Sequence, residues 1–186
     1  PSVEFMLTLI HPEILKTNFS FIDIGCGNGW VVKKMSTHKN CAFALGIDGA
    51  EKMIKKASVN DSKSTYLKID INNITAHKSN LGANIRSFDI VFSMEVLYYL
   101  QSPEMTLKYI RSQILKEGGC CIIGVDHYLE NKSSLSWSKD LNVPMHTYSI
   151  SEWEHMFKEA GFYNITKHQF GKKKNWEGTL IFCAYN

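Results

Sequence analysis

Three glycines at a spacing of two residues are the feature of this sequence that most directly indicates chemistry. Gly25, Gly27 and Gly29 follow the apolar, β-prone stretch Phe19–Ile24 and precede a segment typical of a helix. A strand that turns tightly into a helix brings backbone N–H groups and the positive helix end to one point. Glycine suits such a turn because it adopts positive φ angles and lets a ligand approach the backbone. The stretch therefore predicts a site for the polar part of a nucleotide-like cofactor.

Acidic residues recur at the ends of the apolar stretches that follow. Asp48, Asp70 and Glu95 each come directly after such a stretch or within two residues of its end. In an open parallel sheet, ligands bind outside the carboxyl ends of the strands. The Asp48 carboxylate can accept hydrogen bonds from ribose hydroxyls, although an Asp at a helix start also favours the helix dipole. We expect these acidic residues to share one edge of the sheet with the glycine turn.

The glycine spacing separates this sequence from two other nucleotide-binding classes. The dinucleotide fingerprint G-x-G-x-x-G would need a glycine at position 30, which is Trp30, and no Gly-Lys-Ser/Thr follows as in a Walker loop. Two alternatives remain: a glycine turn without a ligand, and a nicotinamide dehydrogenase, which Trp30 disfavours. The pattern Asp23-x-Gly-x-Gly-x-Gly resembles the first motif of the class I S-adenosylmethionine-dependent methyltransferases, and the resemblance extends from about Phe19 to Tyr185.

This resemblance implies S-adenosylmethionine as cofactor and S-adenosylhomocysteine as product. It places Asp48 on the ribose and Asp70, with the backbone of Ile71, on the adenine. Gly49 departs from the family, which often has an apolar side chain there; Met53 is expected either to cover the adenine instead or to pack in the core. The full set of implied cofactor-binding residues is Asp23, Gly25, Cys26, Gly27, Asn28, Gly29, Asp48, Gly49, Met53, Asp70, Ile71, Met94 and Glu95.

The residues after the fourth predicted strand indicate the kind of acceptor. The segment 93–97 (Ser-Met-Glu-Val-Leu) is similar to the corresponding motif of small-molecule methyltransferases, and the Asn/Asp-Pro-Pro-Tyr motif of adenine-amino methyltransferases is absent. The resemblance thus implies methyl transfer to an oxygen, nitrogen or carbon atom of a small molecule. An RNA or protein methyltransferase, and a non-catalytic domain that binds S-adenosylmethionine, remain as alternatives.

Methyl transfer mainly requires that the acceptor be aligned with the methyl–sulfur axis and that water be excluded. A general base is needed only where the acceptor must lose a proton. His127 and His146 are the catalytic candidates, since both lie in the connection after the fifth predicted strand. A loop histidine can equally be solvated or hydrogen bonded. The aromatic residues expected to line an acceptor pocket, unless they only pack, are Tyr98, Tyr99, Tyr128 and Trp137.

Alternating apolar stretches and helical patterns must position these residues. They predict an α/β fold with a doubly wound, Rossmann-like seven-stranded sheet and helices on both faces. The last two strands have no helix between them, so they should form a hairpin that places one antiparallel strand in a mostly parallel sheet. The expected strands are Phe19–Ile24, Cys41–Ile47, Thr65–Ile69, Phe88–Ser93, Cys120–Val125, Tyr163–Phe170 and Thr179–Tyr185.

Helical sequence patterns occupy the segments before and between the predicted strands. Residues 3–15 have helical spacing that Pro12 bends or divides, and residues 71–87 are polar and predict a loop with one helical turn at most. Ser151 and Glu154 are spaced as a capping box. The expected helices cover residues 28–36, 50–58 and 103–116, the last of them stopped by Gly118 and Gly119, and a further helix runs from the Ser151 cap to Gly161.

Length and composition suit one domain over residues 1–186, with an N-terminal helical segment (1–18) and a substrate-side connection (126–148). The chain begins 18 residues before the first predicted strand, so we expect that its N-terminus has been trimmed. The net charge of +3 gives no argument for nucleic acid, and Lys172–Lys174 are better interpreted as a solvated turn than as a phosphate contact.

Cysteine usage predicts a reducing compartment. The five cysteines are odd in number and include no C-x-x-C pair, which argues against a disulfide framework or a zinc site. No apolar run approaches the roughly 20 residues that span a bilayer. We therefore expect a cytoplasmic enzyme with a small-molecule acceptor, no bound metal and no membrane partner. The sequence leaves the oligomeric state open.

Overall fold

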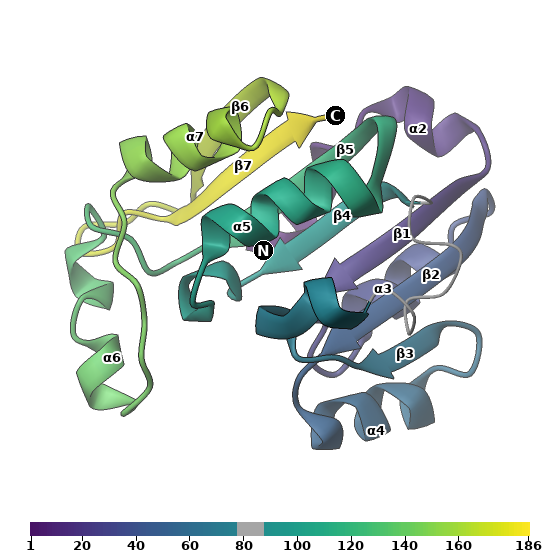
Figure 1. Ribbon diagram of the computed structural model, residues 1–186, viewed down its shortest axis with the longest axis horizontal. Coiled ribbons are helices and arrows are strands. Elements are labelled where there is room, and N and C mark those ends of the chain that lie inside the picture. Colours follow the sequence, from purple (N-terminus) through teal and green to yellow (C-terminus); the bar gives the residue numbers. More distant parts are fainter. Residues whose placement is uncertain (78–87) are drawn as a thin grey trace.

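One seven-stranded sheet organises the computed structural model, which describes residues 1–77 and 88–186 (Figure 1). The strand order is β3-β2-β1-β4-β5-β7-β6. β7 is antiparallel to both neighbours, and the remaining pairings are parallel, which confirms the predicted fold class and its C-terminal hairpin. The strands are β1 (Phe19–Ile24), β2 (Cys41–Asp48), β3 (Thr65–Lys68), β4 (Phe88–Met94), β5 (Leu115–Val125), β6 (Tyr163–Phe170) and β7 (Thr179–Tyr185).

Helices connect the parallel strands, and Pro12 divides the first helical segment in two, as its position predicts. Of the expected loop over 71–87, residues 71–77 form a 3-10 helix and the rest lie outside the described residues. The α-helices are α1 (Ser2–Thr8), α2 (Pro12–Lys16), α3 (Trp30–Ser36), α4 (Glu51–Asn60), α5 (Pro103–Tyr109), α6 (Trp137–Asp140) and α7 (Ile150–Glu159). Shorter turns are η1 (Ile71–His77), η2 (Leu97–Tyr99), the π-helical η3 (Ile110–Ile114) and η4 (Lys132–Ser134).

Both faces of the sheet are buried. Figure 1 shows α5 and α7 in front of the sheet and α3 behind it. Leu107 of α5 and Trp153 of α7 belong to the first core, while Met6 of α1 and Val32 of α3 belong to the second. Each fully buried apolar side chain of this size contributes roughly 1.5–3 kcal/mol. The β1 strand lies between the two cores and is buried along its whole length, so its end is a rigid support for the glycine turn.

The expected helix over 103–116 is wrong at its C-terminal end. Helical structure stops at Ile114, and β5 already begins at Leu115, which is buried beside Phe88. The pairing shifts before Cys120, and Gly118, with φ +71°, lies in that irregular part of the strand. The glycines thus serve a bulge within β5 and do not stop the helix.

The capping box of α7 lies two residues earlier than predicted. The Ser149 hydroxyl accepts a hydrogen bond from the Glu152 amide at 3.2 Å, and the Glu152 carboxylate accepts one from the Ser149 amide at 2.7 Å. Ser151 is exposed, and Glu154 forms ion pairs with lysines instead. Both serine–glutamate pairs have the spacing of a capping box, so spacing alone could not decide between them.

Candidate functional site

The glycine turn between β1 and α3 has the backbone geometry that its sequence predicts. Gly25, Gly27 and Gly29 adopt φ angles of +80°, +53° and +77°. The amides of Gly25 and Cys26 both donate to the carbonyl of Ile47, at 2.8 and 3.0 Å. The turn is therefore joined to the end of β2, and residues with side chains would be strained at all three glycine positions.

The three glycines have different surroundings. A Cβ on Gly25 would lie 2.1 Å from Cγ2 of Val96, and one on Gly29 would lie 2.6 Å from the Tyr66 ring. A Cβ on Gly27 would meet nothing within 4 Å. Gly25 and Gly29 are therefore required by packing within the protein, whereas Gly27 has open space beside its backbone, where a ligand can approach.

Asp48 lies beside this open position. Its Oδ2 accepts a hydrogen bond from the Gly27 amide at 2.9 Å, and its Oδ1 accepts one from the Ala50 amide at 2.7 Å. Each carboxylate oxygen can accept more than one hydrogen bond, so the oxygens keep capacity for hydroxyl groups of a ligand. The side chain is partly exposed, which leaves it accessible from solvent.

Asp23 and Cys26 lie beneath the turn and not on its open side. Burial, together with the nearby Asp48 carboxylate, raises the pKa of Asp23 from 3.8 to about 8. The Cys26 thiol is buried against Gly46, and burial raises its pKa as well. Asn28 is exposed at the tip of the turn and accepts a hydrogen bond from the Trp30 amide at 3.4 Å. Asp23 and Cys26 thus support the turn from below.

The loop after β3 meets the end of β2. The Ile69 amide donates to the Asp48 carbonyl at 3.0 Å, which brings the exposed Asp70 next to Asp48 in the site. The Asp70 carboxylate accepts hydrogen bonds from Asn72 and Asn73, while the Ile71 side chain is buried. These contacts hold Asp70 at the carboxyl edge of the sheet.

Gly49 and Met53 complete this side. Gly49 is exposed, and a Cβ there would lie 4.0 Å from the Cα of Asp70. Met53 is 45% exposed on α4, unlike Ile54 and Ala57, which are buried. The structure thus brings Gly49 and Asp70 together, and the exposed Met53 lies outside the core.

The loop after β4 contains an unusual glutamate. Glu95 has a φ of +62°, and its carboxylate accepts hydrogen bonds from the Tyr98 hydroxyl at 2.7 Å and from the Asp126 amide at 2.5 Å. Burial, followed by repulsion from Asp126, raises the pKa of Glu95 to about 8. The Met94 sulfur instead lies against Gly124, and a Cβ there would be 2.5 Å from it.

His127 is held inside the protein. The ring is fully buried, with Nδ1 2.9 Å from the Ser134 carbonyl oxygen and Nε2 2.8 Å from the Thr147 hydroxyl. A carbonyl only accepts, so Nδ1 carries a proton, and neither ring nitrogen is free for a substrate in this conformation. His146, the other histidine of the connection, is exposed, and its backbone amide donates to the Tyr98 carbonyl at 2.8 Å.

Tyr128 faces the C-terminal hairpin. It is fully buried, and its hydroxyl donates to the Gly178 carbonyl at 3.0 Å and accepts from Gln169, also at 3.0 Å. These partners belong to β6 and the residues preceding β7. Tyr128 therefore anchors the start of the connection to the C-terminal hairpin.

Five rings form a continuous series that passes through the 126–148 connection. Tyr99 contacts Tyr98 with ring centroids 4.4 Å apart, Tyr98 contacts His127 at 5.5 Å, and Trp137 stacks between His127 and Trp176 at 6.4 and 6.0 Å. Tyr98 is buried, whereas Tyr99 is 38% exposed. The structure thus brings Tyr98, His127 and Trp137 together, with Tyr99 at the outer end of the series.

The connection over residues 126–148 is closed at its base. The Leu129 amide donates to the Tyr148 carbonyl at 2.9 Å, so its two ends lie side by side. Figure 1 shows the segment with α6 extending away from the sheet.

Three contacts of the site join segments that are far apart in the chain. Val96 packs on Gly25, the Tyr66 hydroxyl lies 3.2 Å from the Gly29 carbonyl, and Thr147 bonds to His127. Val96 belongs to the segment 93–97, whose sequence already resembles a family motif, whereas Tyr66 and Thr147 had no signal in the sequence.

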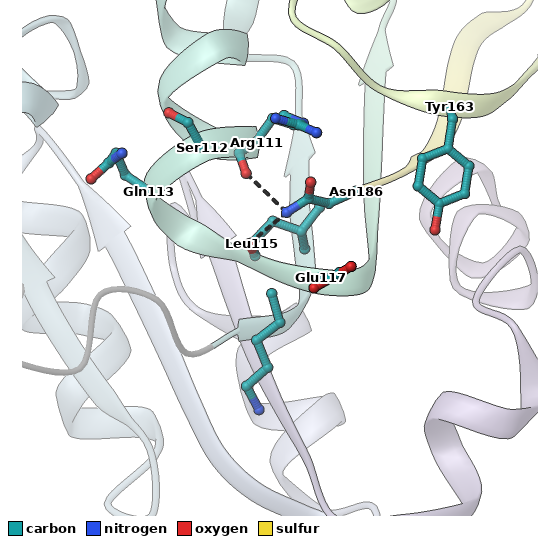
Figure 2. Close-up of a pocket in the computed structure, with 8 residues that line it drawn as sticks. Arg111, Ser112, Gln113, Leu115, Glu117, Tyr163 and Asn186 are labelled. Carbon is teal, nitrogen blue, oxygen red and sulfur yellow. Dashed lines mark hydrogen bonds between the residues drawn. The ribbon is translucent and has the colours of Figure 1, made fainter.

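A separate hollow of about 640 Å³ lies at the other end of β5 (Figure 2). Figure 2 shows the Asn186 amide directed at the carbonyls of Arg111 and Leu115, to which it donates at 3.0 and 2.9 Å. This hollow is lined by none of the predicted site residues. Ligand groups bound by the glycine turn would therefore lie elsewhere.

Over residues 1–77 and 88–186, no group of three or more His, Cys, Asp or Glu side chains is arranged to hold a metal ion. Within the same ranges, no helix has both the length and the apolar character needed to cross a bilayer.

Comparison with known proteins adds independent information. The family model described as "Methyltransferase domain" matches residues 3–167. A curated relative, the ubiquinone biosynthesis O-methyltransferase of Roseobacter denitrificans, is 34% identical over 153 residues, which are 73% of this chain and 59% of the relative. The chain thus spans less than two thirds of that relative's length.

Solved structures share the fold at low sequence identity. A chain of the Haloferax volcanii complex between the Trm112 methyltransferase activator and a methyltransferase has a TM-score of 0.80 at 23% identity, covering 98% of this chain and 87% of that one. An S-adenosylmethionine-dependent methyltransferase from Mesorhizobium loti has a TM-score of 0.76 at 17% identity, with 98% and 96% covered. The [4+2]-cyclase SpnF has a TM-score of 0.70 at 14% identity, with 98% and 79% covered.

Proposed function

Since this chain belongs to the class I S-adenosylmethionine-dependent methyltransferase family, we propose that it transfers a methyl group from S-adenosylmethionine to a small-molecule acceptor. The observation that carries the proposal is the open backbone of Gly27 beside the Asp48 carboxylate. The R. denitrificans relative is an O-methyltransferase, which favours oxygen over nitrogen or carbon as the acceptor atom.

The residues present fit this cofactor. Gly27 leaves room for a ligand against the backbone, and Asp48 offers carboxylate oxygens that suit ribose hydroxyls. We assign Asp70 and the Ile71 amide to the adenine, with Met53 covering it. The amino-acid end would lie toward Gly25 and Glu95. When bound, S-adenosylmethionine supplies a methyl group that its positively charged sulfur has already activated.

The protein's own part in the reaction is alignment and exclusion of water. We propose that Tyr99 and Trp137, both partly exposed, contact the acceptor, and that His146 is accessible to it. His127 and Tyr98 position these groups from inside. His127 uses both ring nitrogens within the protein, so we assign it a positioning role and not that of a general base.

Two alternatives have specific support. The H. volcanii neighbour is in complex with an activator protein, which leaves room for an assembly with a partner protein and for an RNA or protein substrate as the first alternative. The cyclase neighbour shows that this fold also serves other chemistry, so a domain that binds the cofactor without methylating is the second alternative. The mild charge of +3 favours a small molecule over nucleic acid.

A binding experiment tests the cofactor assignment. Calorimetric titration of the chain with S-adenosylhomocysteine should show micromolar binding, and NADH should show none. Asp48→Ala should weaken binding at least about tenfold, which is 1.4 kcal/mol. The control Asp140→Ala changes an exposed aspartate of α6 and should bind normally. Absence of binding to folded wild-type protein would contradict the assignment.

Transfer of a labelled methyl group to a panel of phenols, catechols, amines and carbon acids tests the acceptor class. Product with hydroxyl compounds alone would support oxygen as the acceptor atom. Turnover of RNA or protein, but of no member of the panel, would favour the macromolecular alternative.

We also propose a reducing, cytoplasmic compartment. All five cysteines are free, and the sulfurs of Cys120 and Cys183 are 3.5 Å apart without a bond between them.

A further inference from the structure

We propose that Tyr99, Tyr98 and Glu95 form a proton relay that carries the acceptor's proton from the exposed edge of the site to the partly buried Glu95 carboxylate. This inference rests on the proposed methyl transfer and names the groups that would serve as its base. The sequence suggested histidines for this role, but the structure places a different chain of polar atoms at the carboxyl edge.

Three atoms define the relay. The Tyr98 hydroxyl donates to Oε2 of Glu95 at 2.7 Å, and the hydroxyls of Tyr98 and Tyr99 are 3.5 Å apart. Tyr98 is 1% exposed and Tyr99 is 38% exposed, so the chain of hydroxyls leads from solvent into the protein. Because Tyr98 gives its one proton to Glu95, its oxygen is free to accept the next proton along the chain.

The relay lies next to the glycine turn. Glu95 has the strained φ of +62°, and the next residue, Val96, is packed so closely on Gly25 that a Cβ there would lie 2.1 Å from Cγ2. The same short loop therefore contacts the proposed cofactor turn through Val96 and supplies the partly buried Glu95 carboxylate. Strained backbone of this kind is common at functional sites.

The surroundings of Glu95 favour the protonated form of its carboxyl group, so its carboxylate can act as a base. Its other oxygen, Oε1, accepts the Asp126 amide at 2.5 Å, and the Asp126 carboxyl, whose Oδ1 is buried without a partner in the described residues, repels added negative charge. The titratable groups that face Glu95 are thus Asp126 and Tyr98. Burial and the Glu95 charge raise the pKa of Tyr98, so Tyr98 stays protonated and passes protons without becoming a phenolate.

The proton balance is complete within the site. The acceptor's O–H bond breaks as its oxygen gains the methyl group. The proton moves to the Tyr99 oxygen, the Tyr99 proton moves to Tyr98, and the Tyr98 proton moves to Oε2 of Glu95. Glu95 begins as carboxylate and ends as carboxylic acid, and release of that proton to solvent restores the starting state.

Methyl transfer to the phenol and catechol panel across pH 5.5–9.5 tests the relay in the full chain. The wild-type rate should rise with pH, because only the deprotonated Glu95 accepts a proton, with a midpoint near its pKa of about 8. Glu95→Gln, Tyr98→Phe and Tyr99→Phe should each slow transfer by about 10²–10⁴-fold, the usual contribution of a positioned base. A wild-type rate and pH profile in Glu95→Gln would overturn the proposal.

Matched substitutions outside the site control for general effects. Tyr163→Phe and Glu117→Gln change exposed residues at the opposite end of β5 and should leave the rate and its pH profile unchanged. S-adenosylhomocysteine affinity should be retained in Tyr98→Phe and Tyr99→Phe. Equal losses of rate and of affinity in these two variants would indicate a structural role and contradict the relay.

Infrared difference spectroscopy of carboxyl groups provides a readout that needs no acceptor. Wild-type protein should show a carboxylic acid signal that titrates near pH 8 and is missing in Glu95→Gln; Asp23→Asn identifies the separate signal of Asp23, which titrates in the same range. Tyr98→Phe should move the Glu95 titration to higher pH, because it removes a hydrogen bond that favours the carboxylate.

The two proposals fail in distinguishable ways. If S-adenosylhomocysteine does not bind the wild-type chain, the proposed function fails, and the infrared titration still reports on the relay. If S-adenosylhomocysteine binds, but Glu95 titrates in the ordinary carboxyl range or is unaffected by Tyr98→Phe, the relay is wrong and the proposed function stands.

Discussion

The Asp48 carboxylate accepts a hydrogen bond from the Gly27 amide at 2.9 Å, which joins the end of β2 to the middle of the glycine turn. The same carboxylate accepts the Ala50 amide at 2.7 Å, so one side chain orients both the turn and the start of α4. A site held in this way is already organised before a ligand binds, which reduces the entropy lost on binding.

Gly25 and Gly27 should respond differently to alanine, although both have positive φ angles. Gly27→Ala meets open space, so we expect only the backbone cost, about 1–2 kcal/mol. Gly25→Ala adds a clash with Val96, which should cost about 1–3 kcal/mol more. Urea unfolding of both variants measures the difference. S-adenosylhomocysteine titration should show that the folded Gly27→Ala variant has lost affinity. Equal stabilities would contradict the packing role of Gly25.

Asp23 should make folding stability depend on pH. Its pKa is about 8 in the folded protein against 3.8 ordinarily, so between these values the folded state keeps a proton that the unfolded state has lost. Stability should therefore fall as pH rises through this window, with a limiting slope of about 1.36 kcal/mol per pH unit. Asp23→Asn should gain stability relative to wild type as pH rises from 5 to 8. Parallel curves for the two proteins from urea unfolding would show that Asp23 is not protonated.

His127 should be a stability determinant. His127→Ala removes a buried ring and leaves the Ser134 carbonyl and the Thr147 hydroxyl without that partner, so we expect a loss of about 2–5 kcal/mol. Thr147→Val removes one hydrogen bond and should cost about 1 kcal/mol. His155→Ala, at an exposed position of α7, is the control and should change stability by less than about 0.5 kcal/mol. Thermal unfolding compares the three, and a stable His127→Ala protein would refute the structural role.

The cap of α7 can be located by two serine substitutions. Ser149→Ala removes the hydroxyl that accepts the Glu152 amide and should destabilise the protein by about 1 kcal/mol. Ser151→Ala changes an exposed residue in the first turn and should have an effect below about 0.5 kcal/mol. If chemical unfolding shows a larger stability loss for Ser151→Ala than for Ser149→Ala, the cap is Ser151, as the sequence pattern predicted.

The fold was predictable because its signals are local. Apolar stretches separated by helical patterns predicted a mostly parallel seven-stranded sheet. The missing helix before Thr179 predicted the antiparallel hairpin. The limits of α5 were not predictable in the same way. Gly118 and Gly119 commonly end helices, but a bulge in a strand has the same glycine requirement, and the choice depends on how Leu115 packs.

The candidate site likewise contains parts that local sequence predicts and parts that depend on tertiary contacts. The conformations of the glycine turn and the place of Asp48 follow from residues close in sequence. The histidine hypotheses depended on side-chain direction in a long connection, where burial of His127 and its bond to Thr147 are tertiary outcomes. The environment of Glu95 likewise requires Asp126, which lies in the loop directly after β5.

The hydrogen bond that closes the base of the 126–148 connection has an evolutionary consequence. Since the Leu129 amide and the Tyr148 carbonyl already hold its ends together, residues 138–145, which lie outside the contacts of His127 and His146, can lengthen or shorten without moving the sheet. Doubling the length of such a loop costs only about 0.6 kcal/mol. Under the proposed function, selection would diversify acceptor preference within this short segment, while the glycine turn and its neighbours are inherited intact.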